Sequence, residues 1–263
     1  MQQPSLSLQP SSQNLFLTAL PDDERQRIAA QLELVTLSGK DSIYMQDSPI
    51  DYIYFPLDCI ISSLLVMNDG ATVEVGMIGK EAVVGITAIF GEHRMRNWTR
   101  TLVPGHALRL RSEVVREMFR RSQTTERLLM CCYRAMVTQI SQRAVCNGRH
   151  TMLHRLATWL LMVHDRLASN NLPLTQEIIS GRLGSRRASV TQAACHLQNI
   201  KAISYSRGKI HIEDRDLIET EACECYEVIK KEFDSLKNSG GGAQKIEQNS
   251  FRLAIRTRLR DIQ

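Results

Sequence analysis

The 263-residue chain lacks the features that mark a membrane or secreted protein. It has no run of about 18 consecutive apolar residues, which a membrane-spanning helix would need. Its start, MQQPSLSLQPSSQNLF, contains neither the charged nor the apolar region of a signal peptide. Because 43% of its residues are hydrophobic, wholesale disorder is excluded. We therefore expect a soluble cytoplasmic protein with no membrane partner.

The patterns of common active sites are also missing. No Ser/His/Asp set, phosphate-binding loop or metal dyad stands out in the sequence. The net charge of +5 is mild for a chain of this length, so any strong electrostatic feature must be local. We expect that the protein is not an enzyme.

The seven cysteines contain no CxxC pair and no group of four at zinc or iron-sulfur spacing, so we expect free thiols. Three residues follow one another at four-residue steps: Cys146, His150 and His154. They could share a helix face, but Gly148 is expected to break that helix and a fourth metal ligand is missing. Cys223 and Cys225 are expected on opposite sides of a helix. The sequence therefore predicts no metal site.

The hydrophobic period changes along the chain and predicts an α+β fold. After a polar, Pro/Ser-rich stretch over residues 1–13, expected to be disordered, a helical pattern covers Asn14 to Leu34. Between Val35 and Leu110, short apolar runs alternate with turn residues, which is typical of a barrel or roll of short strands. Within this region Asp69-Gly70 is a strong hairpin signal.

From residue 112 the pattern is helical again. The segment from Thr125 to Val145 has an apolar stripe that needs a partner, and a second copy of the same helix is the simplest one. The predicted dimer seam contains four residues: Leu129, Cys132, Met136 and Ile140. The alternative is a helix of the intramolecular core. Asn147-Gly148 is the expected hinge to further helices over residues 150–168 and 216–237.

The stretch from Leu174 to Ile212 has six Lys or Arg and no acidic residue after Glu177. Thr175 can cap a short helix, Gly184 permits a tight turn, and Ser185 can cap a second helix that ends near Asn199. Alternating apolar residues on both sides of Arg207-Gly208-Lys209 predict two short strands joined by a turn. This order is typical of a winged helix-turn-helix.

The basic residues of this segment predict contact with double-stranded DNA. Arg187 lies in the first turn of the second helix, where its guanidinium can donate two hydrogen bonds to the O6 and N7 atoms of guanine. Gln192 can pair with adenine, and Arg207 and Lys209 of the wing are expected to contact phosphates. The predicted DNA-binding residues are Arg186, Arg187, Ser189, Thr191, Gln192, His196, Arg207 and Lys209. The alternative is an ordinary solvated charged face.

Two sequence stretches resemble the Crp/Fnr family of bacterial transcription regulators. They are LTQEIISGRLGSRRASVTQAACHLQNIKAISYSRGKIHIEDRDLIE and the glycine-punctuated roll with YIYFPLDCIISSLL and DGATVEVGMIGKEAVVG. The motif ACECY, residues 222–226, resembles one branch of the family. The resemblance covers residues 14–237 and implies three regions: a jelly-roll-like β-roll sensor (14–122), a dimerisation helix (123–147) and a winged helix-turn-helix (148–237). The glycine-rich stretch and the basic residues after it predict a flexible basic tail (238–263).

The same resemblance implies a homodimer that reads a two-fold symmetric operator and contacts RNA polymerase. Arg187 stands at the position of the family's guanine-reading arginine. Ala188 stands where many members have a base-reading glutamate, and Gln192 where many have a second arginine. We therefore expect an operator that differs from the best-known one.

The signal that the roll senses is harder to predict. Family members that bind cyclic nucleotides hold the phosphate with a Gly-Glu pair and, about ten residues later, Arg-Ser-Ala or Arg-Thr-Ala. In this chain Gly85 is followed by Ile86, and Arg96 by Asn97. We predict no cofactor and an unknown small-molecule effector at these four residues. The alternatives are a rearranged nucleotide cassette, or a protein-binding scaffold whose helix-turn-helix does not read DNA.

Overall fold

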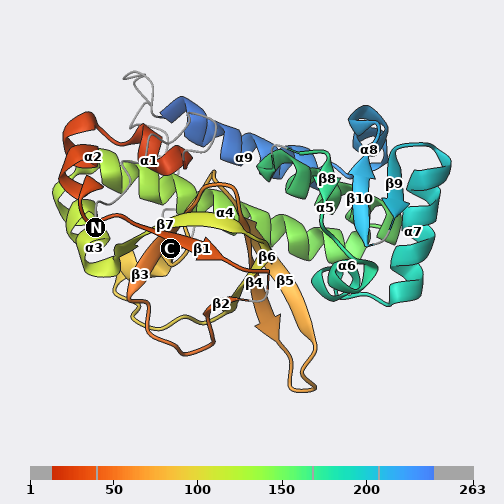
Figure 1. The fold of residues 1–263 in the computed structure, drawn as a ribbon, viewed down its shortest axis with the longest axis horizontal. Helices are drawn as coiled ribbons and strands as arrows, with labels where there is room; N and C mark the ends of the chain where they lie inside the picture. Colours follow the sequence, from red (N-terminus) through yellow and green to blue (C-terminus); the bar gives the residue numbers. More distant parts are fainter. Residues whose placement is uncertain (1–13, 40, 168, 207, 240–263) are drawn as a thin grey trace, which may run out of the picture.

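The computed structural model describes residues 14–39, 41–167, 169–206 and 208–239. The predictions of disorder for residues 1–13 and of a flexible tail after residue 239 lie outside this part of the chain. The β-roll and the helix-turn-helix lie at opposite ends of an elongated molecule, and one long helix runs between them (Figure 1). No described helix is both long and apolar enough to span a membrane.

Two short helices open the described chain, α1 (Leu15–Ala19) and α2 (Asp22–Ala29). The prediction of one helix from Asn14 to Leu34 was too long, because Leu20 and Pro21 adopt extended backbone conformations between them. Asn14 is buried and caps α1 through its side-chain oxygen. Its side-chain nitrogen donates to the backbone of Pro56 and Ala82, which fixes α1 to the β-roll.

The β-roll consists of two antiparallel sheets. One has the order β1-β7-β3 and the other β2-β6-β4-β5. Their bounds are β1 (Glu33–Leu37), β2 (Ser42–Tyr44), β3 (Tyr52–Pro56), β4 (Ile60–Val66), β5 (Thr72–Ile78), β6 (Trp98–Val103) and β7 (Gly105–Arg111). The predicted hairpin at Asp69-Gly70 joins β4 to β5, and Gly70 has the positive φ of 83° that such a turn requires. A 3-10 helix, η2 (Ile86–Phe90), follows β5 and contacts the helix after the roll.

Two helices follow the roll, α3 (Ser112–Arg121) and α4 (Gln123–Arg149). The predicted break at Asn147-Gly148 is wrong: α4 continues through both residues, and the chain turns at His150. The roll, α4 and the C-terminal helices share one continuous hydrophobic core. The long helix therefore connects the two ends mechanically rather than as a loose linker.

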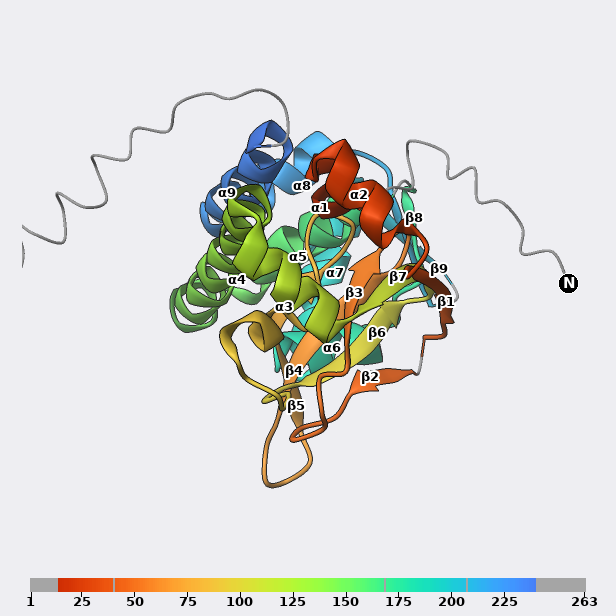
Figure 2. The same cartoon turned by 90° about the vertical axis from the view of Figure 1, so that its left-hand side faces the viewer.

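The remaining chain forms a compact C-terminal unit. Its elements are α5 (Met152–Arg166), β8 (Asn171–Leu172), α6 (Gln176–Leu183), α7 (Arg187–Asn199), β9 (Ile203–Ser206), β10 (Lys209–Ile212), α8 (Arg215–Glu221) and α9 (Cys225–Ser239). The single helix predicted over residues 216–237 is two helices, because the chain turns between Ala222 and Glu224. This turn sends α9 back along α4, antiparallel to it (Figures 1 and 2).

Candidate nucleic-acid interface and sensor pocket

The helix-turn-helix is built from local signals that the sequence contains. Thr175 caps α6 by accepting a hydrogen bond from the Ile178 amide at 3.2 Å, and Gly184 takes the left-handed conformation, with φ of 57°, after the last turn. Ser185 does not cap α7 as predicted: its hydroxyl donates to the Leu183 carbonyl at 3.3 Å and its amide to the Ser180 carbonyl, so both groups complete the end of α6. Arg186 occupies the cap position of α7 instead.

One face of α7 packs into the protein. The predicted apolar stripe is buried, with no member more than 6% exposed: Val190, Ala193, Ala194 and Leu197. Ile179 and Leu183 of α6 are buried as well. Because this packing fixes the rotation of α7, the opposite face of the helix is turned to solvent.

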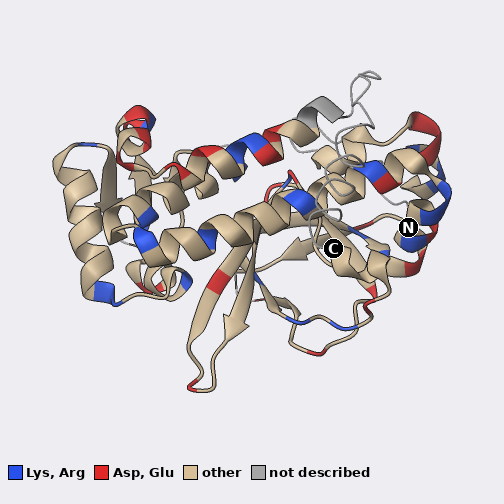
Figure 3. Ribbon diagram, turned by 180° about the vertical axis from the view of Figure 1, so that it is seen from behind, with Lys and Arg blue, Asp and Glu red and all other residues tan. Residues whose placement is uncertain are grey.

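The exposed face of α7 combines positive charge with a free helix amino end. Arg186, Arg187 and Gln192 are exposed. The sequence contains no Asp or Glu from residue 178 to residue 212, and at this end of the molecule Figure 3 shows a few basic segments on a largely uncharged ribbon, with acidic residues on α8 nearby. Since the helix dipole places partial positive charge at the same end, this surface attracts phosphate.

Three other predicted DNA contacts lie elsewhere on α7. The Thr191 hydroxyl donates to Gln176 of α6 at 3.0 Å, and Ser189 is half-buried. The His196 ring lies 3.3 Å from the Glu221 carboxylate on α8. The Thr191 contact holds α7 against α6, whereas the His196 side chain stays 47% exposed beside α8.

The predicted wing is the hairpin of β9 and β10, with Gly208 at a positive φ of 77° in its turn. Lys209 is exposed, whereas Arg207 lies outside the described residues. The sequence analysis missed β8, a two-residue strand that pairs with β10. It also missed Tyr205, whose hydroxyl accepts the Gln176 amide at 3.1 Å and so fixes the wing to α6.

A pocket of about 230 Å³ lies between η2, strands β4 to β6, and α4. Three of the four predicted effector residues, Gly85, Ile86 and Asn97, line it. Arg96 does not: its side chain is 71% exposed and pairs with Glu92 at 3.1 Å and with Asp47 at 3.7 Å. Within the described part of the chain, neither Lys nor Arg lines this pocket. It therefore offers no side-chain cation to a phosphate.

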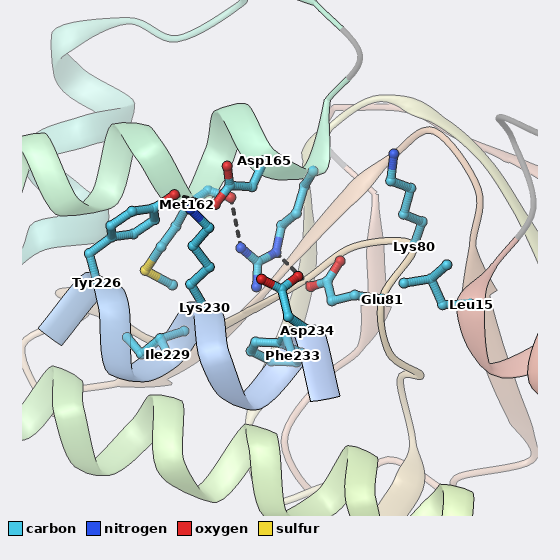
Figure 4. A pocket seen from close by; sticks show the side chains of 11 residues that line it. Leu15, Lys80, Glu81, Met162, Asp165, Tyr226, Ile229, Lys230, Phe233 and Asp234 are labelled. Carbon is cyan, nitrogen blue, oxygen red and sulfur yellow. Dashed lines mark hydrogen bonds and ion pairs between the residues drawn. The ribbon is translucent and has the colours of Figure 1, made fainter. Parts of the chain in front are cut away.

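A second cavity, of about 180 Å³, has a different character (Figure 4). Side chains of α9, including Tyr226, face Asp165 of α5 across it, and Glu81 points in from the roll (Figure 4). Charged partners already occupy its walls, since Arg166 Nε lies 2.6 Å from Glu81 and the Tyr226 hydroxyl donates to Asp165 at 2.9 Å. Burial raises the pKa of Tyr226 above its usual value. This cavity is a junction between the two ends of the molecule.

The exposed apolar face of α4 differs from the predicted dimer seam. Leu129 and Cys132 are buried within the protomer, Met136 is half-buried, and Ile140 is 42% exposed. The apolar residues that α4 leaves exposed at spacings of three and four are Met130, Tyr133, Val137 and Ile140. Two apolar stripes run along α4, and the predicted seam takes Leu129 and Cys132 from the stripe that faces the core and Ile140 from the exposed one.

A buried carboxylate joins the roll to the C-terminal unit. Glu74 on β5 is 1% exposed, and its oxygens accept hydrogen bonds from Ser62 at 2.5 Å and from the Trp159 ring at 2.7 Å. Arg143 of α4 donates both to the Glu74 carbonyl at 3.1 Å and to the Arg182 carbonyl at 3.3 Å. Glu74 and Arg143 therefore link β5 to α5 and to α6 through hydrogen bonds.

One further contact fixes α4 to the same strand. The Gln139 side-chain amide accepts a hydrogen bond from the Met77 amide at 2.6 Å and donates to the Met77 carbonyl at 3.0 Å. Gln139 and Met77 also line the neutral pocket. A ligand in that pocket would thus touch the strand and the helix that support the helix-turn-helix.

Two protein-family models match this chain. Residues 34–122 match the cyclic nucleotide-binding domain, and residues 154–220 match the Crp-like helix-turn-helix domain. Together these matches cover more than half of the chain, in the order that the fold shows. The chain belongs to the Crp/Fnr family of transcription regulators. No curated protein sequence matches it significantly.

Solved structures of Crp/Fnr regulators share this fold. FixK2 from Bradyrhizobium japonicum aligns with a TM-score of 0.64 and 17% identity, over 73% of this chain and 98% of its own. A putative Crp/Fnr regulator from Eubacterium rectale aligns with a TM-score of 0.61 and 16% identity, over 76% and 94%. The regulator TTHB099 from Thermus thermophilus has a TM-score of 0.60 and 14% identity, over 72% and 96%. The α+β architecture predicted from the sequence is confirmed.

Proposed function

We propose that this Crp/Fnr protein is a sequence-specific DNA-binding regulator that acts as a homodimer. The observation that carries the proposal is the amino end of α7, where Arg186 and Arg187 are exposed on a helix held by a turn and a wing. A helix of this kind fits the major groove of DNA, and an arginine in its first turn can read guanine. The contact with RNA polymerase implied by the resemblance stays a prediction.

The proposed dimer seam is the exposed stripe of α4. Met130, Tyr133, Val137 and Ile140 repeat at the spacing of a coiled-coil seam and leave apolar surface in water. Phe90 of η2, which is 47% exposed, packs edge-on against Tyr133 at 5.0 Å between ring centroids and widens the stripe. Two copies related by a two-fold axis would bury this surface and present two α7 helices to one operator.

The effector proposed for the roll is a small, largely uncharged molecule. The pocket is smaller than the range of about 300 to 1,000 Å³ that is typical of ligand sites, and its walls are mainly apolar. Asn97 and Ser63 supply a polar spot there, joined by a hydrogen bond of 3.1 Å. Tyr133, Val137 and Ile140 belong both to the pocket wall and to the proposed seam, so a ligand would affect dimer and pocket together.

DNA binding can be tested without knowledge of the target genes. Duplexes selected by the protein from a random pool would be footprinted and then titrated by fluorescence anisotropy at several salt concentrations. We expect two half-sites about one helical turn apart and an affinity that falls steeply with salt. A protein that selects no sequence and leaves no footprint would instead be a scaffold whose helix-turn-helix makes protein contacts.

A further inference from the structure

Four potential metal ligands converge where α4 ends. Cys146 and His150 come from the last turn and the end of α4, while Cys223 and Cys225 come from the connection between α8 and α9. One ligand atom from each residue lies within 4.8 Å of all the others. The three cysteines are at most 7% exposed, and the His150 side chain is 16% exposed.

The spacing of these atoms matches a tetrahedral metal site. Cys146 Sγ lies 3.6 Å from Cys223 Sγ, and Cys225 Sγ lies 3.7 Å from His150 Nδ1. Zinc bonds of about 2.3 Å to sulfur and about 2.0 Å to nitrogen give tetrahedron edges of about 3.8 Å between two sulfurs and about 3.5 Å between sulfur and nitrogen. These two pairs already stand close to the edge lengths that a bound cation would impose, and all four ligand atoms lie within 4.8 Å of one another.

The surroundings of the four residues also fit a metal site. His150 turns Nδ1 to the thiols, while its Nε2 lies 3.4 Å from the Glu224 carboxylate. Metal-bound histidines commonly donate their second ring N–H to such a group, which orients the ring and strengthens the ligand. Thr158 of α5 contacts the Cys223 sulfur at 3.1 Å and accepts the Cys223 amide at 3.2 Å.

The sequence analysis rejected a metal here for two reasons that the structure removes. The helix is not broken at Gly148, so Cys146 and His150 remain on one face of α4. The missing ligands come from elsewhere in the chain: Cys223 precedes α9 and Cys225 begins it, so these two thiols do not sit on opposite sides of one helix and both reach Cys146 and His150. His154, the third residue of the original set, instead contacts the Glu221 carbonyl at 2.9 Å.

We propose that Cys146, His150, Cys223 and Cys225 form a Cys₃His site for a tetrahedral divalent cation of the zinc class. The site would join the end of α4 to the start of α9 at His150, where the chain turns toward α5. Three thiolates and an imidazole with no open position are typical of zinc sites that stabilise a fold. The cation would therefore fix the bend between the long helix and the helix-turn-helix.

The first test measures metal in the untagged full-length protein, purified under reducing conditions without chelator. We expect one zinc per chain by mass spectrometry of the digested protein. After replacement of zinc by Co²⁺, we expect the visible bands of tetrahedral cobalt and strong sulfur-to-cobalt charge transfer in the near ultraviolet. Removal of the metal should lower the thermal midpoint of the wild type, because the unfolded chain lacks the preformed site.

Variants locate the site. Cys223→Ser and His150→Ala should lose the metal, whereas Cys131→Ser and His154→Ala, which change the same residue types outside the site, should retain one zinc per chain. Glu224→Gln leaves all four ligands in place and should weaken metal affinity by about 10- to 100-fold while the circular dichroism spectrum stays unchanged. This variant keeps the test informative if Cys223→Ser does not fold.

Several results would overturn the proposal. A reduced protein that neither contains zinc nor gives cobalt–thiolate charge transfer has no such site. Zinc that remains bound in both Cys223→Ser and His150→Ala lies elsewhere. A Cys146–Cys223 disulfide with no metal uptake after reduction would make the cluster a thiol pair, and iron with acid-labile sulfide would replace the zinc assignment by a cluster.

Discussion

The amino end of α7 presents two exposed arginines, whereas the pocket of the β-roll, as far as the chain is described, is lined by neutral side chains. Both regions belong to domains whose family ligands are phosphate-bearing molecules. At α7 the charge, the helix end and the wing combine in one surface. In the roll the backbone of the domain is present, but Arg96 points outward to Glu92 and Asp47.

This contrast separates the fold of a domain from the chemistry of its site. The strands and η2 of the roll depend on buried apolar residues, and they form whether or not a cation lines the pocket. Recognition of a phosphate depends on a very few side chains, which can change while the core stays the same. Membership in the Crp/Fnr family therefore says more about the helix-turn-helix of this protein than about the ligand of its β-roll.

The largest expected effect comes from charge placed in the proposed dimer seam. Val137→Glu would bury two like charges against each other, which should cost about 3 kcal/mol or more and weaken the dimer by more than about 100-fold. Sedimentation should show monomers, and operator affinity should fall with them. Val228→Glu, at a similarly exposed valine on α9, is the matched control. Equal behaviour of the two variants would move the interface away from α4.

The link between the two regions can be broken at Trp159. Trp159→Phe removes the hydrogen bond to the buried Glu74 carboxylate, a loss of about 1.5 to 3 kcal/mol in the free energy of unfolding. Urea denaturation followed by circular dichroism measures this loss. The control is Trp98→Phe on β6, which makes the same substitution at the other of the two tryptophans and leaves Trp159 in place. A Trp159→Phe protein as stable as the wild type would show that the hydrogen bond between Trp159 and Glu74 contributes nothing to the link.

Arg187→Ala tests the α7 side of the contrast. Loss of a bidentate contact to guanine should cost about 1 to 3 kcal/mol on the selected operator and much less on random DNA, as measured by anisotropy. The charge-matched control is Arg121→Ala, an exposed arginine at the end of α3. An equal loss on both kinds of DNA would assign Arg187 to phosphate contact alone.

The smallest expected effect is that of cyclic nucleotides. With no cation lining the described pocket, cyclic AMP and cyclic GMP should bind no more tightly than about millimolar in calorimetry. Arg96→Ala should change nothing, because this side chain is already paired in water. A micromolar dissociation constant that Arg96→Ala abolishes would show a rearranged cassette and remove the contrast.

The accuracy of sequence-based prediction varied between these regions for a physical reason. Thr175, Gly184 and the Asp69-Gly70 turn act on backbone atoms a few residues away, so their roles could be predicted from the sequence. Glu74 with Trp159, and Cys146 with Cys223, are 85 and 77 residues apart and meet only after the domains pack. The 3-4-3 spacing of Met130, Tyr133, Val137 and Ile140 was a usable signal that a second stripe on α4 concealed.

The contact between Gln139 and Met77 has a consequence for solubility. β5 is the last strand of its sheet, and the open side of such a strand can add a strand from another molecule and start aggregation. The Gln139 side chain forms hydrogen bonds with both the amide and the carbonyl of Met77, and Arg143 donates to the Glu74 carbonyl. Helix α4 therefore covers part of this open side. Any displacement of α4 that opens the roll would also free these backbone groups, which favours regulatory motions that keep α4 seated on β5.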